Sequence, residues 1–396
     1  MNKQRLSRLP DAMARHVQQG ALPGLVTAVS HRGEVHVDVI GAQAVGGAPM
    51  RRDTIFRITS MTKPVAAVAA MILVEECRLR LDEPVDRLLP ELANRQVLTQ
   101  MDGLVEHTVP AERPITLRDL LTFRMGFGVI FGPEEEYPIL RAARELELGT
   151  LGPPVPATPH APDEWMRRLG SLPLMCQPGE RWLYNSAFAV LGVLIARAAD
   201  QPLETFLRER IFAPLGMKDT AFSVPAAKLD RLATSYWVNA QTGGLDLHDS
   251  AEESYWSRPP VFPDAAAGLV STIDDYLAFG QMLLNQGKLG NERILSRASV
   301  ETMTADHLTP GQKARSGFFP GYWENQGWGF GVSVVTGRDN LWAVPGRYGW
   351  DGGYGTSWYN DPREDLVAIL MTQRGEFPLF SPVWQDFWSS VYQAIE

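Results

Sequence analysis

Ser60 and Lys63 stand three positions apart in the stretch Ser60-Met61-Thr62-Lys63, at the start of a strongly helical, alanine-rich segment. Side chains at i and i+3 of a helix are neighbours, so the hydroxyl and the amine would come within hydrogen-bond reach. A serine hydroxyl becomes a useful nucleophile when an adjacent base takes its proton. A lysine amine is such a base only if its pKa falls from about 10.4 toward neutrality, which burial promotes. The pair therefore predicts nucleophilic catalysis by serine if the helix is buried.

The segment that follows Lys63 favours burial. Residues 63–74 are apolar nearly all round, which is typical of a helix inside a large core. Among the six lysines of the chain, only Lys63 has a serine three positions earlier. The alternative is an ordinary helix start, in which Ser60 is the N-cap and Lys63 is solvated. Taken alone, the four residues favour that alternative.

A second polar group is Tyr184-Asn185-Ser186, which follows a glycine-bearing turn and precedes an apolar helical stretch at 187–196. A tyrosine in this place can pack on the helix as a hydrophobic staple. It can also exchange a proton with Lys63 and Ser60 and deliver it to a leaving group, which is general acid/base catalysis. Ser186 would be a helix cap or a substrate contact.

A third group is the glycine-dense stretch 349–358, which contains Trp350, Gly352 and Gly353. Glycines at the entry of a strand allow a ligand to approach the backbone closely. A free N–H on this strand, together with the N–H of Ser60, would make an oxyanion hole, where one donor is typically worth about 10²- to 10³-fold in rate. The alternative is a simple hairpin turn.

Composition restricts the remaining function classes. The 396 residues carry a net charge of −9, with 45% hydrophobic and 21% charged residues, as in ordinary globular proteins. Lysine and arginine are not clustered, so neither a nucleic acid nor an anionic membrane is an expected partner. No apolar run approaches 18 residues, which argues against a membrane span. A small neutral or cationic molecule is the more plausible partner.

Cofactors and metals are not expected either. The seven histidines are scattered without the spacing of a metal site. Cys77 and Cys176 belong to no CxxC motif and are expected to be reduced structural thiols. The first residues lack the apolar core of a secretory signal. We therefore expect a cytoplasmic protein that uses neither metal nor cofactor.

The first part of the chain predicts a helix, a hairpin and a buried helix. Apolar residues recur every three to four positions through residues 1–20, which indicates an amphipathic helix. Residues 24–30 and 34–40 read as two strands around a short turn. Residues 56–59 form a short extended entry to the helix that begins near Ser60.

The middle of the chain reads as helical and the end as β-structure. Helices are expected at 117–121, 187–199 and 203–212, with a loop-rich tract at 126–162 and few strand signals before about residue 330. A further helix is expected at 272–285. Four strands should follow, and a last helix at 382–395 closes the chain. The expected strands span 329–336, 341–344, 355–359 and 366–372.

This order predicts an α+β fold, with an antiparallel sheet built from both chain ends, flanked by helices, and an inserted helical lobe. The expected domains are 1–86 with 262–396, around an inserted helical domain at 87–261.

The three polar groups, in this order and at this separation, resemble the motifs of the penicillin-recognising serine hydrolases. The chain looks most like their esterase branch, the family VIII carboxylesterases, which are similar to class C β-lactamases and penicillin-binding proteins. Other stretches that carry the resemblance lie along the whole chain, from about residue 5 to 395. They are 56–63, 115–122, 211–220 and 268–272.

The resemblance implies a β-lactamase/transpeptidase-like fold and a two-step acyl transfer. Ser60 would attack a carbonyl carbon, and Lys63 and Tyr184 would move protons as general base and acid. The backbone N–H groups of Ser60 and Gly353 would hold the oxyanion, and water would release the acyl group. Gly353 is assigned by its place three residues after Trp350.

One departure from the family pattern favours esters. In the β-lactamases and peptidases of this group the third motif begins with a lysine that can bind a substrate carboxylate, whereas here it begins with Trp350, which is uncharged and has one N–H donor. Phe127, Tyr137, Ser186 and Gly352 are the other expected substrate contacts, although for each aromatic residue taken alone a place in the core is the favoured alternative. We therefore expect a serine carboxylesterase, with a β-lactamase or DD-peptidase as the alternative.

Overall fold

The computed structural model describes residues 1–130, 136–149, 155–376 and 381–396. Its main sheet has seven strands in the order β11-β12-β13-β14-β15-β1-β2, and every neighbouring pair is antiparallel. The N-terminal hairpin joins the sheet because β1 pairs with β15, so both ends of the chain build it, as predicted. The strands are β1 (Gly24–His31), β2 (Glu34–Gly41), β11 (Gln326–Trp328), β12 (Ser333–Val335), β13 (Tyr348–Gly352), β14 (Thr356–Asp361) and β15 (Leu366–Thr372).

The hairpin of β1 and β2 turns through Arg32 and Gly33, whose φ angles of 50° and 82° are both positive. Two-residue turns of this kind match the right-handed twist of the flanking strands. All residues of β1 are buried, whereas β2 is the edge of the sheet and consists of exposed and half-buried residues. The β-hairpin predicted for residues 24–30 and 34–40 is confirmed.

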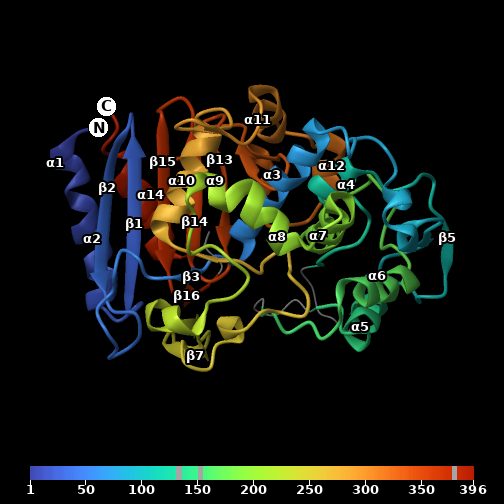
Figure 1. Cartoon of the computed structure of the whole chain (residues 1–396), viewed down its shortest axis with the longest axis horizontal. Coiled ribbons are helices and arrows are strands. Elements are labelled where there is room, and N and C mark those ends of the chain that lie inside the picture. Colours follow the sequence, from blue (N-terminus) through green and yellow to red (C-terminus); the bar gives the residue numbers. More distant parts are fainter. Residues whose placement is uncertain (131–135, 150–154, 377–380) are drawn as a thin grey trace.

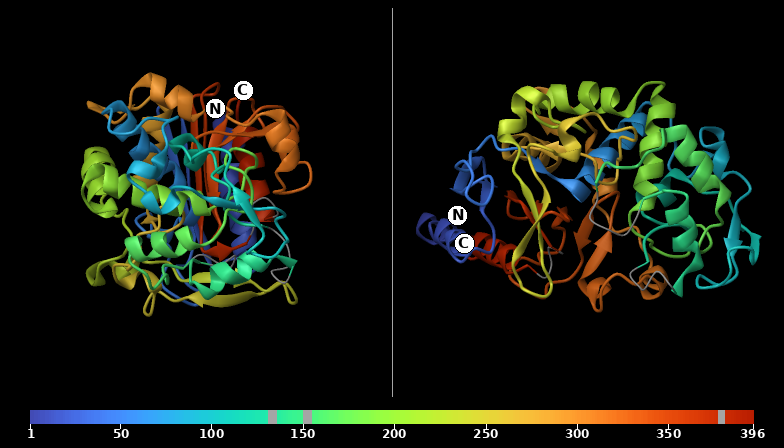
Figure 2. Two further views of the ribbon diagram at one scale, coloured as in Figure 1. Left: turned by 90° about the vertical axis from the view of Figure 1, so that its right-hand side faces the viewer. Right: turned by 90° about the horizontal axis from the view of Figure 1, so that it is seen from below.

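Helices cover both faces of the sheet (Figures 1 and 2). On one face, α2 (Arg8–Gln18) packs against α14 (Pro382–Tyr392), and their apolar side chains share a core with β1 and β15. On the other face, α10 (Ile273–Leu284) contacts β1, β14 and β15. The two termini lie side by side. The amphipathic helix predicted at residues 1–20 is interrupted at Ser7, which separates α1 (Lys3–Leu6) from α2.

The helix after the Ser60 motif is α3 (Thr62–Glu75), and it lies between the sheet and the helical part of the molecule (Figure 1). Its residues from Thr62 to Leu73 are all buried, as the apolar sequence predicted. It packs on α7 (Ser186–Ala199), another apolar helix. Ser60 itself lies one step earlier, in a short 3₁₀ turn, Thr59–Met61.

The helical part lies away from the main sheet, at the right of Figure 1. The loop-rich tract at 126–162 contains a helix that was not predicted, α5 (Pro138–Glu145), begun by Pro138 in its first turn. Residues 131–135 and 150–154 of that tract lie outside the described residues. The other helices beyond the main sheet are α4 (Leu117–Leu121), α6 (Pro162–Ser171), α8 (Leu203–Leu207), α9 (Ala213–Leu215), α11 (Arg297–Met303), α12 (Pro310–Arg315) and α13 (Tyr322–Asn325). A π-helical turn, Arg208–Phe212, joins α8 to α9.

Short strands occur where few strand signals were found. β6 (Ser235–Val238) pairs with β7 (Leu245–Asp249) and, in parallel, with β16 (Arg374–Gly375) next to the end of β15. The remaining small pairs are β3 (Phe56–Arg57) with β8 (Val270–Ser271), β4 (Gln96–Leu98) with β5 (Thr108–Pro110), and β9 (Lys288–Leu289) with β10 (Glu292–Arg293). The domain boundaries at 86/87 and 261/262 stay a prediction.

Two strand predictions near the end of the chain were wrong. Residues 341–344 form no strand, because the Asn340 side chain accepts hydrogen bonds from the N–H groups of Trp342 and Ala343 and bends the backbone into a turn. The strand expected at 329–336 is limited to β12, since Gly331 has a φ of 71° and turns the chain between β11 and β12.

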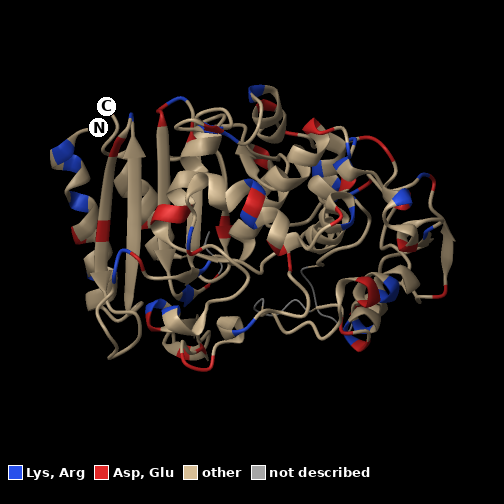
Figure 3. Ribbon diagram, in the orientation of Figure 1, with Lys and Arg blue, Asp and Glu red and all other residues tan. Residues whose placement is uncertain are grey.

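No single helix among the described residues is both long and apolar enough to cross a membrane; α7 and the segment Leu203–Leu215 pass that test only as a pair bent by 78°. Acidic and basic residues are interspersed over the outer elements in the view of Figure 3, and the central strands carry few of either.

Candidate active site

Ser60 and Lys63 meet as the i, i+3 spacing predicted. Lys63 Nζ donates a hydrogen bond of 2.9 Å to Ser60 Oγ and another of 2.7 Å to the backbone carbonyl of Ala266. No side-chain cap bond is present at the start of α3, so the reading of Ser60 as a helix cap is excluded. The Ser60 hydroxyl faces the amine instead.

The amine of Lys63 is fully buried. Desolvation lowers its pKa to about 7, against an opposing effect of the Asp264 carboxylate, which raises it. The Tyr184 ring lies 4.5 Å from Nζ. Near neutral pH a large fraction of this amine is therefore uncharged, and only the uncharged form can accept a proton from Ser60.

The backbone that presents Ser60 is strained. Thr59 has a φ of 41°, an uncommon angle for a β-branched residue, and its side chain is fully buried. Strained residues of this kind persist where the surrounding structure holds them, and they gather at functional sites. Here the neighbour is β13, which packs directly on the 3₁₀ turn.

Gly352 makes that packing possible. A Cβ on Gly352 would meet the Ile58 carbonyl oxygen and the hydroxyls of Thr59 and Thr356. Gly353 differs, since a Cβ there would have no neighbour within 4 Å. Gly352 thus lies against the backbone that carries Ser60, and Gly353 borders open space. The glycine-rich stretch is also a hairpin, because β13 turns into β14 through residues 353–355, so both readings of the sequence apply.

Tyr184 reaches the same site from the segment before α7. It shares a side-chain hydrogen bond with Ser60, and its oxygen accepts a 2.8 Å hydrogen bond from Trp350 Nε1. Burial raises the pKa of Tyr184 above its usual value. The phenol consequently keeps its proton at neutral pH. Phe123 and Phe318 pack on its ring at centroid distances of 5.1 and 5.7 Å.

A tight turn follows Tyr184. Asn185 has φ 81° and ψ −67°, and the N–H of Ser186 bonds back to the Tyr184 carbonyl at 3.2 Å. This is a γ-turn of the rare, strained kind with positive φ. The Tyr184 carbonyl also accepts the N–H of Val129 at 2.9 Å, which ties the turn to the neighbouring segment.

The side chains of Trp350 and Asp351 point to opposite faces of β13. Because side chains alternate along a strand, Trp350 points to Tyr184 while Asp351 points to the opposite face. There the Asp351 carboxylate accepts hydrogen bonds from Ser357, Tyr359 and Trp384 at 2.6 to 2.9 Å. This buried network attaches β13 to β14 and α14, and so holds the strand that carries Trp350.

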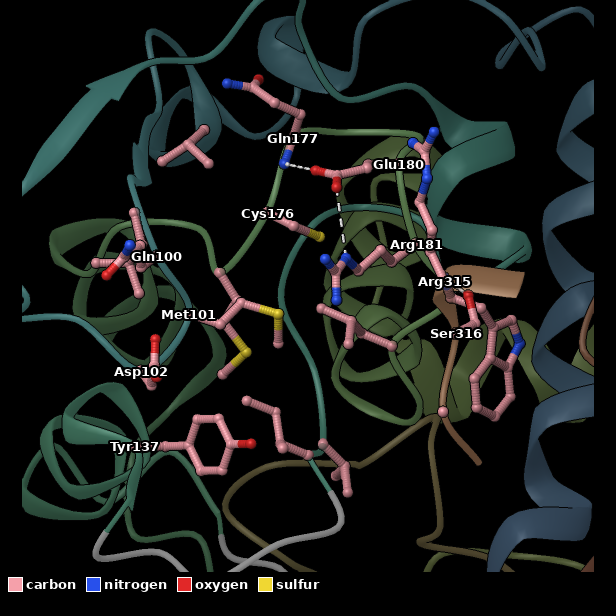
Figure 4. A pocket seen from close by; sticks show the side chains of 18 of the residues that line it. Gln100, Met101, Asp102, Tyr137, Cys176, Gln177, Glu180, Arg181, Arg315 and Ser316 are labelled. Atoms are coloured by element: carbon pink, nitrogen blue, oxygen red, sulfur yellow. Dashed lines mark hydrogen bonds and ion pairs between the residues drawn. The ribbon is translucent and has the colours of Figure 1, made fainter. Parts of the chain in front are cut away.

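The predicted substrate contacts divide between two cavities. Phe127 and Ser186 line a cavity of about 370 Å³ together with Asn185 and Asp264. Tyr137 lines a separate cavity of about 1170 Å³, shown in Figure 4, whose lining includes none of Ser60, Lys63, Tyr184 and Trp350. The lining of the smaller cavity includes none of these four residues either, so the role of Tyr137, like that of Phe127 and Ser186, stays a prediction. Val129 lines both cavities.

Two contributors to the site were not predicted. The Ala266 carbonyl accepts a hydrogen bond from Lys63 Nζ, and no sequence signal reports a backbone acceptor. Asp264 lies two residues earlier, just before the stretch 268–272 that carries part of the family resemblance. Its place next to that stretch could have indicated Asp264. The residue type could not, because the chain contains many other acidic residues.

The sequence profile of the Beta-lactamase family matches residues 9–385. The chain belongs to the Beta-lactamase family. It is 40% identical to protein Rv1367c of Mycobacterium tuberculosis, over 89% of this chain and 86% of the relative. It is 30% identical to esterase EstB of Burkholderia gladioli, over 98% of this chain and 95% of the relative.

A solved structure with a similar fold supports the architecture. EstCE1, described as a hydrolase with promiscuous acyltransferase activity, aligns with a TM-score of 0.78 over 98% of this chain and 99% of its own, at 24% identity. The predicted α+β, β-lactamase/transpeptidase-like fold is confirmed, as is the resemblance to serine β-lactamase-like esterases.

Proposed function

We propose that this Beta-lactamase family protein is a serine hydrolase that cleaves carboxylic esters through an acyl-enzyme on Ser60. The observation that carries the proposal is the 2.9 Å contact between Ser60 Oγ and a buried Lys63 amine whose pKa is about 7. Such an amine is a general base at neutral pH. The likeness to an esterase at 30% identity over nearly the whole chain supports esters as the substrate class.

In the first step the uncharged Lys63 amine takes the Ser60 proton while Oγ attacks the ester carbonyl carbon. Tyr184 keeps its proton because burial raises its pKa, and it is the group that delivers a proton to the departing alkoxide. In the second step a water molecule attacks the acyl-enzyme carbonyl. The same groups transfer protons in the reverse sense, and the acid is released from Ser60.

The tetrahedral intermediates carry an oxyanion that needs donors. We assign this role to the backbone N–H groups of Ser60 and Gly353. The assignment is supported by the packing of Gly352, the residue before Gly353, against Ile58 and Thr59, the residues before Ser60, and by the open space at Gly353. Backbone donors held in this way need no reorganisation when charge develops.

β-Lactam or peptide hydrolysis is the weaker candidate. Trp350 has no charge to pair with a substrate carboxylate, and its single N–H is already bonded to Tyr184. The ring is 6% exposed and packs on Trp328 and Phe318. These features support a site for uncharged acyl groups.

Two measurements test the proposal. A fluorophosphonate probe should label the protein on Ser60, as read by peptide mass, and the Ser60→Ala variant should lose the label and at least about 10³-fold of p-nitrophenyl butyrate hydrolysis. Ser171→Ala, at an exposed serine on α6, is the matched control and should keep both. Full activity of Ser60→Ala, or faster turnover of nitrocefin than of the ester, would refute the assignment.

A further inference from the structure

The cavity of about 370 Å³ that Asn185, Ser186 and Asp264 help to line lies between α5, α6 and the start of α7. A cavity of this size is within the range that holds small-molecule ligands. Most of its wall is apolar, and its polar side chains fall into two groups, one near Asn185 and Ser186 and one on and after α5. Its apolar lining includes Phe127, Val129, Leu140, Leu148, Trp165 and Phe262.

Asp264 belongs to the group near the reacting residues. Its side chain accepts the N–H of Ala266 at 2.8 Å, and its carbonyl accepts the N–H of Gly268 at 2.8 Å. Ala266 in turn offers its own carbonyl to Lys63 Nζ at 2.7 Å. The Asp264 carboxyl therefore closes the turn that holds the Lys63 amine, and it lines the cavity at the same time.

The charges that line the cavity do not cancel at this end. Arg144 and Glu147 lie close together along the chain, in and just after α5, and have opposite sign. Glu147 is also within 3.2 Å of His160. Lys63, the cation nearest to Asp264 along this chain of contacts, is uncharged in its catalytically active form. At the end of the cavity nearest to Lys63, the carboxylate of Asp264 is therefore the charge without a balancing cation in the described part of the chain.

We propose that Asp264 determines the charge selectivity of the esterase, so that the cavity accepts an apolar group that is neutral or cationic and rejects a carboxylate. This inference rests on the proposed function and deepens it. A like charge brought into a partly desolvated site is disfavoured unless it is paired. Among the described residues that line the cavity, the basic side chain is Arg144 of α5, which already has a partner. Asp264 is thus a second reason, besides Trp350, for a preference against carboxylate-bearing substrates.

The carboxylate has a further effect on the base. Asp264 raises the pKa of Lys63 against the larger lowering caused by desolvation, and burial raises the pKa of Asp264 itself. Discrimination against anions depends on the ionised carboxyl group. It should therefore increase as pH rises through the raised pKa of Asp264.

The test measures how a change at Asp264 alters the relative rates for esters of different charge. On the acyl side these are p-nitrophenyl butyrate, mono-p-nitrophenyl succinate and p-nitrophenyl 4-(trimethylammonio)butyrate; on the alcohol side, butyrylthiocholine and its neutral carbon isostere. Asp264→Asn keeps an oxygen that can accept the Ala266 N–H, and it removes the charge. We expect this variant to raise kcat/KM for the anionic ester about 10-fold or more relative to butyrate. We also expect the acidic limb of its pH profile to move to lower pH.

The controls separate this inference from the proposed function. Glu301→Gln removes one charge from an exposed ion pair with Arg297 on α11, away from the cavity lining, and should leave the selectivity unchanged. Asp264→Ser provides a second uncharged variant if the first unfolds early. An active, folded Asp264 variant could keep the same ratio of kcat/KM between charged and neutral esters, whether the charge is in the acyl or the alcohol group. That result would overturn this inference and leave the proposed function standing. Absence of butyrate hydrolysis by the unaltered protein would instead overturn the proposed function.

Discussion

Trp350 Nε1 donates a 2.8 Å hydrogen bond to the hydroxyl oxygen of Tyr184, and this contact joins the first strand of the glycine-rich hairpin to the helical part of the molecule. The bond stabilises negative charge on the phenol oxygen. Such charge develops only when Tyr184 releases its proton, so the contact would act on the transition state more than on substrate binding.

Replacing Trp350 by phenylalanine tests this reading. Trp350→Phe keeps an aromatic ring against Phe318 and Trp328 but removes the N–H donor. We expect kcat for p-nitrophenyl butyrate to fall about 10-fold, the order expected for one lost hydrogen bond, with KM nearly unchanged. A change confined to KM would place the effect of Trp350 in substrate binding.

A lysine at position 350 tests substrate choice. Trp350→Lys introduces the charge that the β-lactamases of this group have at the start of their third motif. We expect nitrocefin turnover to rise relative to ester hydrolysis, measured as the ratio of the two kcat/KM values. An unchanged ratio in a folded variant would mean that residue 350 does not occupy the carboxylate position.

The pH dependence of activity should report Lys63. Its pKa is lowered to about 7, so kcat/KM should rise with pH through about 7 and then level off as the amine becomes uncharged. Tyr184 has a pKa raised above its usual value of 10, so no loss of the acid is expected at moderately alkaline pH. Initial rates from pH 5.5 to 9.5 check this. A profile that falls across neutral pH would contradict the roles of both residues.

Lys63 should also influence stability, with a defined sign. Between about pH 7 and 10.5 the unfolded chain keeps the lysine proton that the folded chain has lost, so the free energy of unfolding gains at most about 1.4 kcal/mol per pH unit from this group as pH rises. Lys63→Met removes this dependence. The free energy of unfolding of Lys63→Met should exceed that of the unaltered protein by the largest amount below pH 7, and this difference should shrink toward pH 10. Denaturant titrations at pH 6.5, 8 and 9.5 measure it, and a gap that widens with pH would refute the buried-amine account.

Gly352 and Gly353 form a matched pair of adjacent positions. Gly352→Ala would place a methyl group against the Ile58 carbonyl and the Thr59 hydroxyl, so we expect a drop in Tm of several degrees and a loss of activity. Gly353→Ala meets no atom within 4 Å and should leave Tm within about 1 degree. Equal Tm values for the two variants would show that the strand does not need glycine at 352 for its close approach to the Ser60 turn.

Periodicity was a good guide where an element buries a defined face. It predicted β1, β2, α3, α7 and α10 closely, because their apolar residues follow the period of a strand or of a buried helix. It failed at residues 341–344, where an asparagine side chain bends the backbone, and at α5 and β6, where short elements carry little pattern of their own.

The contacts of the site also fall into local ones, which the sequence indicates, and long-range ones, which it does not. The spacing of Ser60 and Lys63 made their contact possible, because a separation of three residues is a local property, but the same four residues also fitted a helix cap, and the structure decided between the two. By itself, the sequence determined that the surrounding helix is buried. Only the tertiary structure decided that Trp350 bonds to Tyr184, that Tyr137 lines another cavity, and that Asp264 and Ala266 hold the Lys63 amine. These contacts join residues far apart in the chain, and their distances depend on how the sheet and the helices pack around α3.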